Sequence, residues 1–499
     1  MSTYSLNNRG GTSPMAHRRF LLAGAAFLPL ALAGCATFSP DNGLSLARGI
    51  TQQELGKGVV KTTTEVDAAA AQARAEALLK KPLTPDSAVQ IALLQNRGLQ
   101  AAFNDLGVSE AVYVEATLPP RPTFALSRLA GGLELEVERQ ILIGLFELAT
   151  LPGRAAIAEQ RFRAAQFRTA EAVLRLAAET RRQYYRTIAA NQQVAFLEQA
   201  LASAEAMSQL AQQLGESGAL NKLEQAREHA FYVELGAQLA RARIEQKVAR
   251  ERLTRQLGVW GREIDFRLPN ALPSLPASLV SAKDIERRAL ETRVDLRALR
   301  ADLNAVAGQY GLTGATRFIS DIELAGLQKY DRKTFIDAAE GKVEREKLNR
   351  RGLEIAFQIP IYDFGEIGVR NAEETYMAAA NRVAERAVNV RSEAREAYLR
   401  YRGHYDLAQH YQSRVLPLRQ AIQDESLLQY SGMLADVSQL IIDARARILS
   451  NLDAINARRD FWIAATDLKA ALVGGGAGGS DGDGSTTVAA AAGGSAGGH

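Results

Sequence analysis

Residues 353–370 constrain the fold more strongly than any other part of the sequence. Residues 353–359 alternate strictly between apolar and polar side chains, which predicts a β-strand with one apolar face and one wet face. Pro360 ends that strand, and a short turn follows. After Arg370 the chain is polar, rich in alanine and free of proline for tens of residues, which is the composition of a long helix. A half-wet strand that leads directly into a very long helix is unusual in a soluble protein.

The overall composition agrees with long helices. Only 6% of the 499 residues are aromatic, while alanine, arginine, glutamate, glutamine and leucine dominate. This mixture is typical of long helices and coiled coils rather than of a compact α/β enzyme. The 60 basic and 56 acidic residues are interspersed and leave a net charge of +4. Interspersed charge indicates solvated helix faces and gives no nucleic-acid footprint.

The N-terminus has the features of a secretory signal, which we assign to residues 1–34. A basic stretch precedes a short apolar core at residues 20–33, and this core is too short to span a membrane. The core ends in Leu32-Ala33-Gly34-Cys35, which resembles the cleavage box of bacterial lipoproteins. That resemblance implies cleavage before Cys35 and a covalent lipid on this cysteine, the only one in the chain.

The residues after the cysteine indicate a membrane destination. Ala36, rather than aspartate, follows Cys35, and in bacterial lipoproteins this favours the outer membrane. An ordinary signal peptide with an accidental cysteine is the alternative, and Met15 is an alternative start to Met1. No later apolar run has the length of a membrane-spanning helix, so a chain that crosses the bilayer would do so as a closed β-barrel.

The first half of the chain predicts one helix, two strands and a long helical hairpin. Threonine suits the N-cap and proline the first helical turn, so a helix begins at Thr84-Pro85. Strict alternation predicts the strands, and apolar residues three or four apart predict the helices. The expected elements after the Thr84 helix are strands over 123–129 and 133–138, a helix of roughly 60 residues (about 90 Å) from Leu151, and a return helix over 221–257.

The second half predicts the same order of elements. Ser281 and Asp284 have the spacing of a capping box, which places a helix start there. The strand over 353–359 then precedes the second long helix. The expected elements are a helix over 285–310, a strand over 318–327, a charged insertion over 329–351, the strand over 353–359, a helix over 366–430 and a return helix that ends near Val473.

The two halves form an internal repeat. Landmark residues recur in the same order in both: Leu99 with Leu296, Arg154 with Arg370, Gly218 with Gly432, and Gly258 with Gly474. A duplicated unit of this kind is far more specific than any of its pieces. The expected domains are a lipidated arm over 35–82, repeats over 83–268 and 269–473, and a disordered Gly/Ser/Ala tail over 474–499.

With these residues in place, the chain resembles the TolC family of outer-membrane efflux channels over nearly the whole of residues 83–473. The carriers of the resemblance are the start at Leu83-Thr84-Pro85-Asp86-Ser87-Ala88, the junction motif Pro360-Ile361-Tyr362-Asp363-Phe364-Gly365, and the paired turn glycines. The resemblance implies a mainly helical fold with a membrane part. Each protomer would give four strands to a shared twelve-stranded trimeric β-barrel, and long antiparallel hairpins would form a periplasmic α-barrel.

Together with the lipoprotein box, the resemblance implies a passive exit duct of a tripartite pump in the outer membrane of a Gram-negative bacterium. It implies a homotrimer whose partners are a periplasmic adaptor protein and an inner-membrane pump. The substrate class is open, since drugs, metal ions and proteins leave through such ducts. A periplasmic coiled-coil lipoprotein that tethers or scaffolds the envelope is the alternative function.

Candidate pore-lining residues follow from the strand pattern. Glu134, Glu136 and Glu138 share one face of their strand, and in a barrel these carboxylates would line water and disfavour anions. Glu354 and Gln358 occupy the corresponding face of the strand over 353–359. A soluble amphipathic hairpin with solvated glutamates is the alternative interpretation. Leu353, Ile355, Phe357 and Ile359 are expected to face lipid, as are Leu133, Leu135 and Val137.

The resemblance also assigns the ends of the hairpins. Gly215, Gly218, Ser431 and Gly432 reverse the chain and are candidates for docking an adaptor, together with Asp436. Some family members close this end with an arginine after the second turn glycine, but Leu434 lies near that position here. The junction residues Pro360, Tyr362, Asp363 and Gly365 would lie where barrel becomes tunnel.

No catalytic or metal-binding motif is present in the sequence. His404 and His410 are six residues apart and fall on different helical faces, which is not a metal-binding spacing. Asp363 and Glu366 suit helix capping better than acid–base chemistry. No P-loop or dinucleotide fingerprint occurs, so the chain is expected to be no enzyme, to use no cofactor beyond the lipid on Cys35, and to rely on a partner for energy.

Overall fold

A computed structural model describes residues 37–132, 134–336, 343–432, 434, 437–474 and 476. The chain divides into two compact units, each described separately below. The sheet unit comprises Met1–Leu44, Asn104–Gln166 and Ala298–Val383, and the hairpin unit comprises the remaining segments. Residues 1–36, Leu133, Asp436 and nearly all of the tail lie outside the described residues, so the expectations for the signal peptide, the lipidated Cys35 and Asp436 stay predictions.

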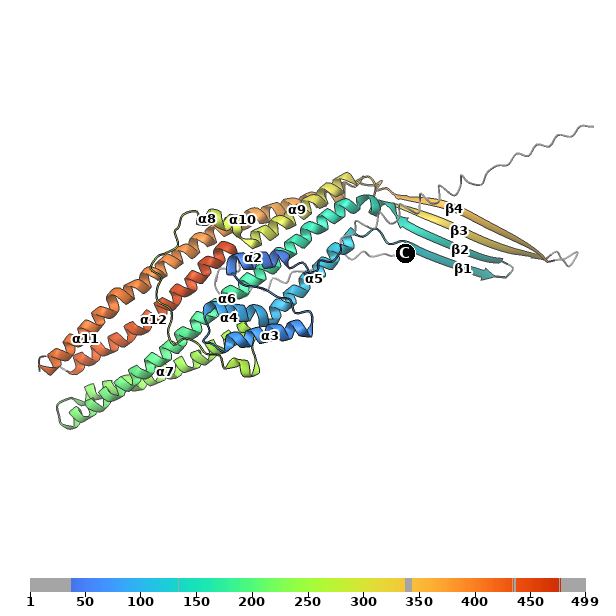
Figure 1. Cartoon of the computed structure of the whole chain (residues 1–499). Coiled ribbons are helices and arrows are strands. Elements are labelled where there is room, and N and C mark those ends of the chain that lie inside the picture. The colour runs from blue at the N-terminus through green and yellow to red at the C-terminus, as the bar shows by residue number, and fades with distance from the viewer. Residues whose placement is uncertain are drawn as a thin grey trace, which may run out of the picture. The chain divides into compact units, whose positions relative to one another are not determined.

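The sheet unit is built on four antiparallel strands in the order β1-β2-β3-β4 (Figure 1). Parts of four helices complete it. These strands and helices are β1 (Thr123–Gly131), β2 (Glu134–Gly144), β3 (Asp321–Ile336), β4 (Val343–Gln358), α5 (Arg97–Thr117), α6 (Leu145–Glu216), α9 (Val294–Ala315) and α10 (Glu366–His410). Each half of the chain therefore gives one hairpin to the sheet, as the repeat predicts.

The charged insertion expected over 329–351 is wrong. These residues extend β3 and β4, which pair without interruption from Asp321 and Gln358 to Ile336 and Val343. Charged residues are depleted in strands on average, which is why the segment looks like a loop. Here the charged side chains alternate between two sheet faces on which they remain exposed or partly exposed. The strand conformation therefore does not bury their charges.

The first long helix also begins earlier than expected. Helix α6 begins at Leu145, directly after β2, and Pro152 lies within its second turn. Pro152 removes one helical hydrogen bond, and the helix continues through it. In the sheet unit, Gly153 and Gly308 let α6 and α9 approach closely, because a Cβ at Gly308 would lie 3.0 Å from a side-chain carbon of Ile157.

The hairpin unit contains the helical hairpins and the helices that pack on their bases. Residues of the expected arm over 35–82 form two helices, α2 and α3. The elements of this unit are α2 (Ser45–Leu55), α3 (Glu65–Leu79), α4 (Pro85–Gln95), α7 (Lys222–Leu257), the short η2 (Gly261–Ile264), α8 (Ile285–Thr292), α11 (Leu416–Ser431) and α12 (Val437–Val473), with the far parts of α6 and α10.

The second long helix is continuous apart from one π-helical turn, η3 (Tyr411–Val415), between α10 and α11. The amide of Leu416 donates to the carbonyl of Tyr411, and Pro417, which has no amide hydrogen, follows at once. Proline within a helix removes one α-type hydrogen bond, and a π-turn absorbs the displacement. The expected helix over 366–430 is thus confirmed with a local widening.

Two predicted caps have different outcomes. Thr84 forms a capping box with Ser87, because its Oγ1 accepts from the amide of Ser87 at 3.1 Å and the Ser87 Oγ accepts from the amide of Thr84 at 2.8 Å. The capping box expected at Ser281 and Asp284 is wrong. Asp284 has a left-handed backbone (φ 62°) and makes no side-chain cap.

The repeat is visible in matching helix breaks within the hairpin unit. Helix α4 ends at Asn96, and its counterpart α8 ends at Arg293, each with an extended backbone. The side chain of Asn96 donates to the carbonyl of Gln256 at the end of α7, and Arg293 donates to the carbonyl of Ala471 at the end of α12. Each return helix therefore ends against the break in its own half.

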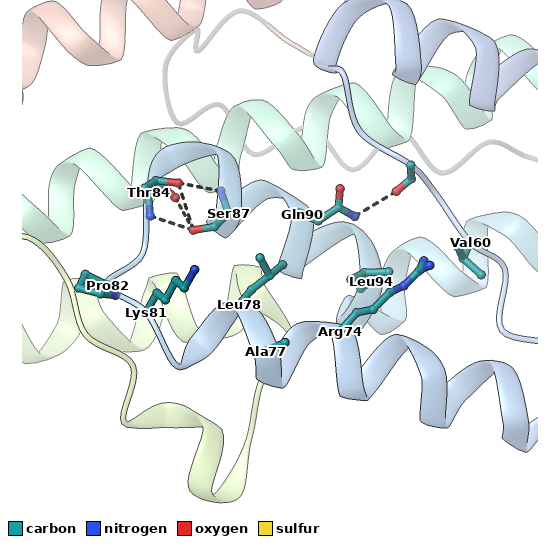
Figure 2. Close-up of a pocket in the computed structure, with 11 residues that line it drawn as sticks. Val60, Arg74, Ala77, Leu78, Lys81, Pro82, Thr84, Ser87, Gln90 and Leu94 are labelled. Atoms are coloured by element: carbon teal, nitrogen blue, oxygen red, sulfur yellow. Dashed lines mark hydrogen bonds between the residues drawn. The ribbon is translucent and has the colours of Figure 1, made fainter.

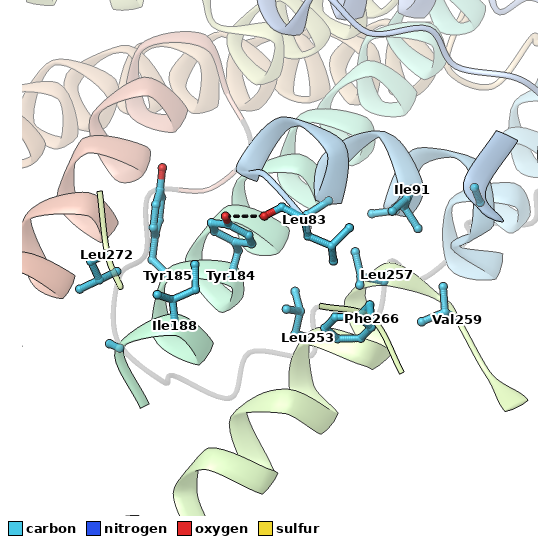
Figure 3. Close-up of a cluster of buried hydrophobic side chains, with 14 of the residues drawn as sticks. Leu83, Ile91, Tyr184, Tyr185, Ile188, Leu253, Leu257, Val259, Phe266 and Leu272 are labelled. Carbon is cyan, nitrogen blue, oxygen red and sulfur yellow. Dashed lines mark hydrogen bonds between the residues drawn. The ribbon is translucent and has the colours of Figure 1, made fainter. Parts of the chain in front are cut away.

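A cluster of buried apolar side chains gathers around the start of α4 (Figure 3). Leu83 and Ile91 pack with Leu253 and Leu257 of α7, all essentially inaccessible to solvent. The hydroxyl of Tyr184 on α6 donates to the carbonyl of Leu83 at 2.8 Å, so the buried phenol has a partner. This core fixes the base of the first hairpin. Among the described residues, no helix is both long and apolar enough to cross a membrane.

Candidate functional site

The strand register assigns every residue of the sheet to one of two faces. Glu134, Glu136 and Glu138 of β2 lie directly opposite Lys333, Asp331 and Lys329 of β3. Pairing of β3 with β4 places Glu354 and Gln358 on this same face. The five predicted pore-lining residues therefore share one surface, which we call the acidic face.

The acidic face contains cations that the sequence reasoning did not place there. Lys329 forms an ion pair with Glu136, Lys333 with Glu134 at 3.2 Å, and Arg350 with Asp331 at 3.5 Å. The sequence prediction treated residues 329–351 as an insertion and therefore did not place these cations opposite the glutamates. The period-two alternation of side chains in a strand, continued from residue 327, would have placed them there. Acidic residues still outnumber basic ones among the described side chains of this face: Glu134, Glu136, Glu138, Asp321, Glu323, Asp331, Glu346 and Glu354 against Lys329, Lys333 and Arg350.

The opposite face is apolar where the strands meet the helices. Its successive cross-strand rows hold Ile322 and Phe357, then Ile143, Leu324 and Ile355, then Phe124, Ile141 and Leu353. Several of these side chains are largely exposed, Phe124 at 73% and Leu353 at 80%. Leu135 and Val137 share this face, whereas Leu133 lies outside the described residues. An exposed apolar surface of this extent marks an interaction site.

The junction between β4 and α10 is a tightly packed turn. The carboxylate of Asp363 accepts from the amides of Gly365 and Ile367, each at 3.2 Å, so it caps the helix. Gly365 has φ +72°, and a Cβ there would lie 2.1 Å from the carbonyl oxygen of Arg317. The Arg317 Nε donates in turn to the carbonyl of Phe364 at 3.2 Å. The capping role expected of Asp363 is therefore present.

Exposed apolar side chains surround this junction. Tyr362 is 97% exposed, and the remaining members of this set are more than half exposed: Phe318, Ile359, Ile361, Phe364 and Ile367. Aromatic residues with one polar end favour the interface between lipid and water. The first-half junction has no such turn, since β2 leads directly into α6 at Leu145.

The predicted tip residues form two different reversals. Gly218 has φ +77°, and the amide of Ala219 donates to the carbonyl of Leu214 at 2.8 Å, so the first reversal needs a left-handed glycine. Gly432 has φ −84°, which other residues also adopt, and Ser431 Oγ donates to the carbonyl of Leu428 at 2.8 Å. Both reversals carry exposed leucines: Leu210 and Leu223 at the first, and Leu427, Leu428 and Leu434 at the second.

An ion pair between the half-buried Arg445 and the buried Glu228 joins the two hairpins within the hairpin unit. Arg445 of α12 lies 3.5 Å from the carboxylate of Glu228 on α7, donates to the carbonyl of Arg227 at 2.8 Å and covers the ring of Phe231 at 4.3 Å. Burial raises the pKa of Glu228, while the Arg445 guanidinium opposes that shift. Sequence reasoning missed this contact, because residues distant in the chain give no local pattern.

A second buried cluster surrounds Arg293, which is only 1% exposed. Its guanidinium donates to Asp295 at 2.7 Å and also to Glu393, and Arg386 contacts both carboxylates. Burial alone would raise the pKa of Asp295, but the hydrogen bonds and charges of Arg293 and Arg386 hold it below its ordinary range. The charges are mutually satisfied, so the cluster is structural.

A cavity of about 590 Å³ lies along α3 and α4 (Figure 2), and Leu78, Gln90 and Leu94 are among its lining residues. The amide of Gln90 already donates to the carbonyl of Gly58 at 3.1 Å. Across the described ranges, no cluster of histidine, cysteine, aspartate or glutamate has the geometry of a metal site.

Comparison with known proteins gives matches to solved structures only. No protein-family model matches the sequence, and no curated protein does. A membrane protein from Pseudomonas aeruginosa matches with a TM-score of 0.66 and 18% identity, over 80% of this chain and 92% of its own. VceC, an outer membrane protein of Vibrio cholerae, matches with a TM-score of 0.63 and 14% identity, over 82% and 97%.

A third match is the MtrE outer membrane channel of Neisseria gonorrhoeae in its open state, with a TM-score of 0.61 and 16% identity, over 80% of this chain and 89% of that one. At such identities the likeness establishes the fold. Each of the three neighbours is matched over about nine-tenths of its length or more. The chain has the fold of the TolC family of outer-membrane channels, as its sequence motifs predict.

Proposed function

We propose that this protein is the outer-membrane exit duct of a tripartite efflux system. It acts as a passive, lipid-anchored homotrimer that carries substrates from an inner-membrane pump across the periplasm and the outer membrane. The observation that carries the proposal is the two-faced sheet, with carboxylates on one face and exposed apolar rows on the other. A membrane barrel needs this division, with water inside and lipid outside.

The free sheet edges support assembly from several copies. Each of β1 and β4 pairs with one strand only among the described residues. Unpaired strand edges are not tolerated in lipid, so the sheet needs further strands to close it. Three copies of a four-stranded sheet give a twelve-stranded ring, the arrangement that the family resemblance implies.

The hairpins and the N-terminus support the remaining parts of the proposal. The exposed leucines at both tips offer apolar contacts to an α-helical adaptor. Cys35 provides the lipid anchor, and the pump supplies the energy, so substrate diffuses through the duct without chemistry. Opening requires the tips to move apart.

The test is to purify the full-length protein in detergent and measure its oligomeric state and its conductance in planar bilayers. A heat-modifiable trimer that forms water-filled conducting pores supports the duct. A monomer that Cys35→Ser releases intact into the soluble fraction, and that never conducts, would contradict it and favour a periplasmic tether.

Docking at the tips has its own test. Residues 215–218 and 431–434 are each replaced by a scrambled sequence of the same composition, and export is measured in cells. Export should be lost although trimers and bilayer conductance persist. Wild-type export by the doubly scrambled protein would remove the docking role.

A further inference from the structure

The outward continuation of the apolar face is basic. Beyond the three apolar rows, described above, this face carries six exposed cations and no acidic residue among its described side chains: Arg128, Arg139, Arg332, Arg345, Lys347 and Arg351. We call this set the basic band. Within the described residues, no ion pair joins any of the six to a carboxylate, whereas each cation of the acidic face has one.

The basic band includes a like-charge pair that calls for a counter-anion. Arg332 and Lys347 are direct partners across β3 and β4. Like charges directly opposite each other destabilise a sheet in the absence of an anion between them. The cations of the acidic face avoid this repulsion because each pairs with a carboxylate. The cations of the basic band have no such carboxylate partner among the described residues.

The distance from the apolar row nearest the helices to the Arg332–Lys347 pair matches the height of the apolar band of a membrane barrel. Phe357 and Lys347 lie on the same face of β4, ten residues apart. That separation is about 33 Å along a strand at 3.3 Å per residue, or about 25 Å of height at a strand tilt of about 40°. An outward apolar band of a membrane barrel is about 25 Å tall. Arg332 and Lys347 would therefore lie at the outer headgroup layer.

We propose that the basic band binds phosphate groups of lipid headgroups in the outer leaflet. This inference rests on the proposed membrane function. Arg332, Arg345 and Lys347 meet the phosphates directly. Arg139 and Arg351 share a row that lies two rows closer to the helices than Arg332 and Lys347, and they extend their long side chains outward toward the same layer. Guanidinium groups suit this task, because their fork of donors matches phosphate oxygens.

The test compares lipid binding by full-length proteins in mixed detergent micelles. Native mass spectrometry counts the copies of diphosphoryl lipid A retained, with monophosphoryl lipid A and zwitterionic phosphatidylcholine as comparison lipids. The variant is Arg332→Gln, Arg345→Gln, Lys347→Gln. The matched control is Lys329→Gln, Lys333→Gln, Arg350→Gln, which removes the same charge from the opposite face of the same hairpin.

The wild-type protein and the control should retain diphosphoryl lipid A in preference to both comparison lipids. Each cation removed from the basic band should weaken that binding about fivefold, which corresponds to about 1 kcal/mol. Equal retention by the basic-band variant and the wild type would overturn the proposal. So would full competition by inorganic phosphate at constant ionic strength, because it would show a site for free anions rather than for lipid.

Bilayer conductance separates this inference from the proposed function. A protein that inserts and conducts normally but shows no preference for diphosphoryl lipid A over the two comparison lipids contradicts the basic-band inference alone. A protein that never inserts or conducts contradicts the duct itself. The basic-band variant should retain trimers and conductance, because its substituted residues face away from the acidic face.

Discussion

At the scale of single residues, Gly365 is the position where the backbone tolerates least change. Its φ of +72° disfavours any side chain, and the carbonyl oxygen of Arg317 occupies the space that a Cβ would need. Gly365→Ala should lower stability by about 2–3 kcal/mol, of which about 1 is backbone strain and the rest displacement of the turn. The measurement is the thermal unfolding midpoint of the purified protein.

Gly368→Ala is the matched control for Gly365→Ala. Gly368 lies in the first turns of α10, and a Cβ there would make an ordinary contact with Thr313 at 3.8 Å. Alanine favours a helix over glycine by about 1 kcal/mol, so this variant should be equal or slightly more stable. Similar losses in both variants would refute the argument from the left-handed turn.

Asp295 is the residue whose charge holds the buried arginine cluster together. Asp295→Asn leaves Arg293 buried with less compensation and should cost about 3–5 kcal/mol. The pKa of the wild-type carboxyl is lowered by Arg293 and Arg386 against the effect of burial, so its contribution is present above the ordinary aspartate pKa. It is lost as the pH falls through the folded-state value, and the asparagine variant should lack this part of the acid destabilisation.

Unfolding midpoints measured between neutral and acid pH test the Asp295 prediction. Asp406→Asn is the control, because Asp406 pairs with Arg402 on an exposed surface where such pairs contribute little. The control should follow the wild-type curve. An Asp295→Asn curve parallel to the wild type over the whole acid range would count against the role of this carboxylate.

At the scale of elements, the sequence predicted those helices and strands whose position depends on interactions between residues close together in the chain. The Thr84 cap, the strand over 353–359 and the end of the return helix α7 at Gly258 follow from side chains within a few residues, and the structure has them. The length of the β3–β4 hairpin does not, because charged residues 329–351 remain in strands through cross-strand partners such as Glu136 for Lys329. Contacts at a distance escape a local pattern.

The same distinction explains the candidate site. Alternation alone placed Glu134, Glu136 and Glu138 on one face, since a strand has a fixed period of two. Their ion pairs with lysines could have been found by continuing that alternation through residue 333. The Arg445–Glu228 contact could not, because it depends on how two hairpins pack.

That contact yields a prediction about the hairpins. Arg445→Met keeps apolar packing on Phe231 but removes the charge opposite Glu228. The pKa of Glu228 is raised by burial with Arg445 opposing it, so it should rise further in the variant. A carboxyl with a raised folded-state pKa favours the native state when protonated, and this advantage is lost as the pH rises through the window between the ordinary and the raised value.

In the Arg445→Met protein, the contact between the two hairpins should therefore be weaker at neutral pH than at mildly acid pH. Bilayer recordings should then show more frequent channel opening at neutral pH. Arg445→Met with Glu228→Gln provides the control, because it removes both charges and the pH dependence with them. Opening that is independent of Arg445 at every pH would show that the pair does not restrain the tips.

At the scale of the whole molecule, the internal repeat gives both halves the same order of helices and strands. The helix breaks at Asn96 and Arg293 occupy equivalent places and both bind the end of a return helix, yet one uses an amide and the other a buried cation. The charged cluster around Arg293 is built from second-half residues, Asp295, Arg386 and Glu393. Repeats conserve geometry, while the chemistry that satisfies each buried group can differ.

The acidic face predicts the ion preference of the proposed pore. A carboxylate about 10 Å from a permeating ion contributes about 0.4 kcal/mol in water, so several per protomer give a severalfold preference for cations. Glu134→Gln, Glu136→Gln, Glu138→Gln removes three and leaves Lys329 and Lys333 without their carboxylate partners. Reversal potentials under a salt gradient should then shift toward anions. Arg345→Gln, Lys347→Gln on the opposite face should leave them unchanged, and an equal shift in both proteins would show that the acidic face does not line the pore.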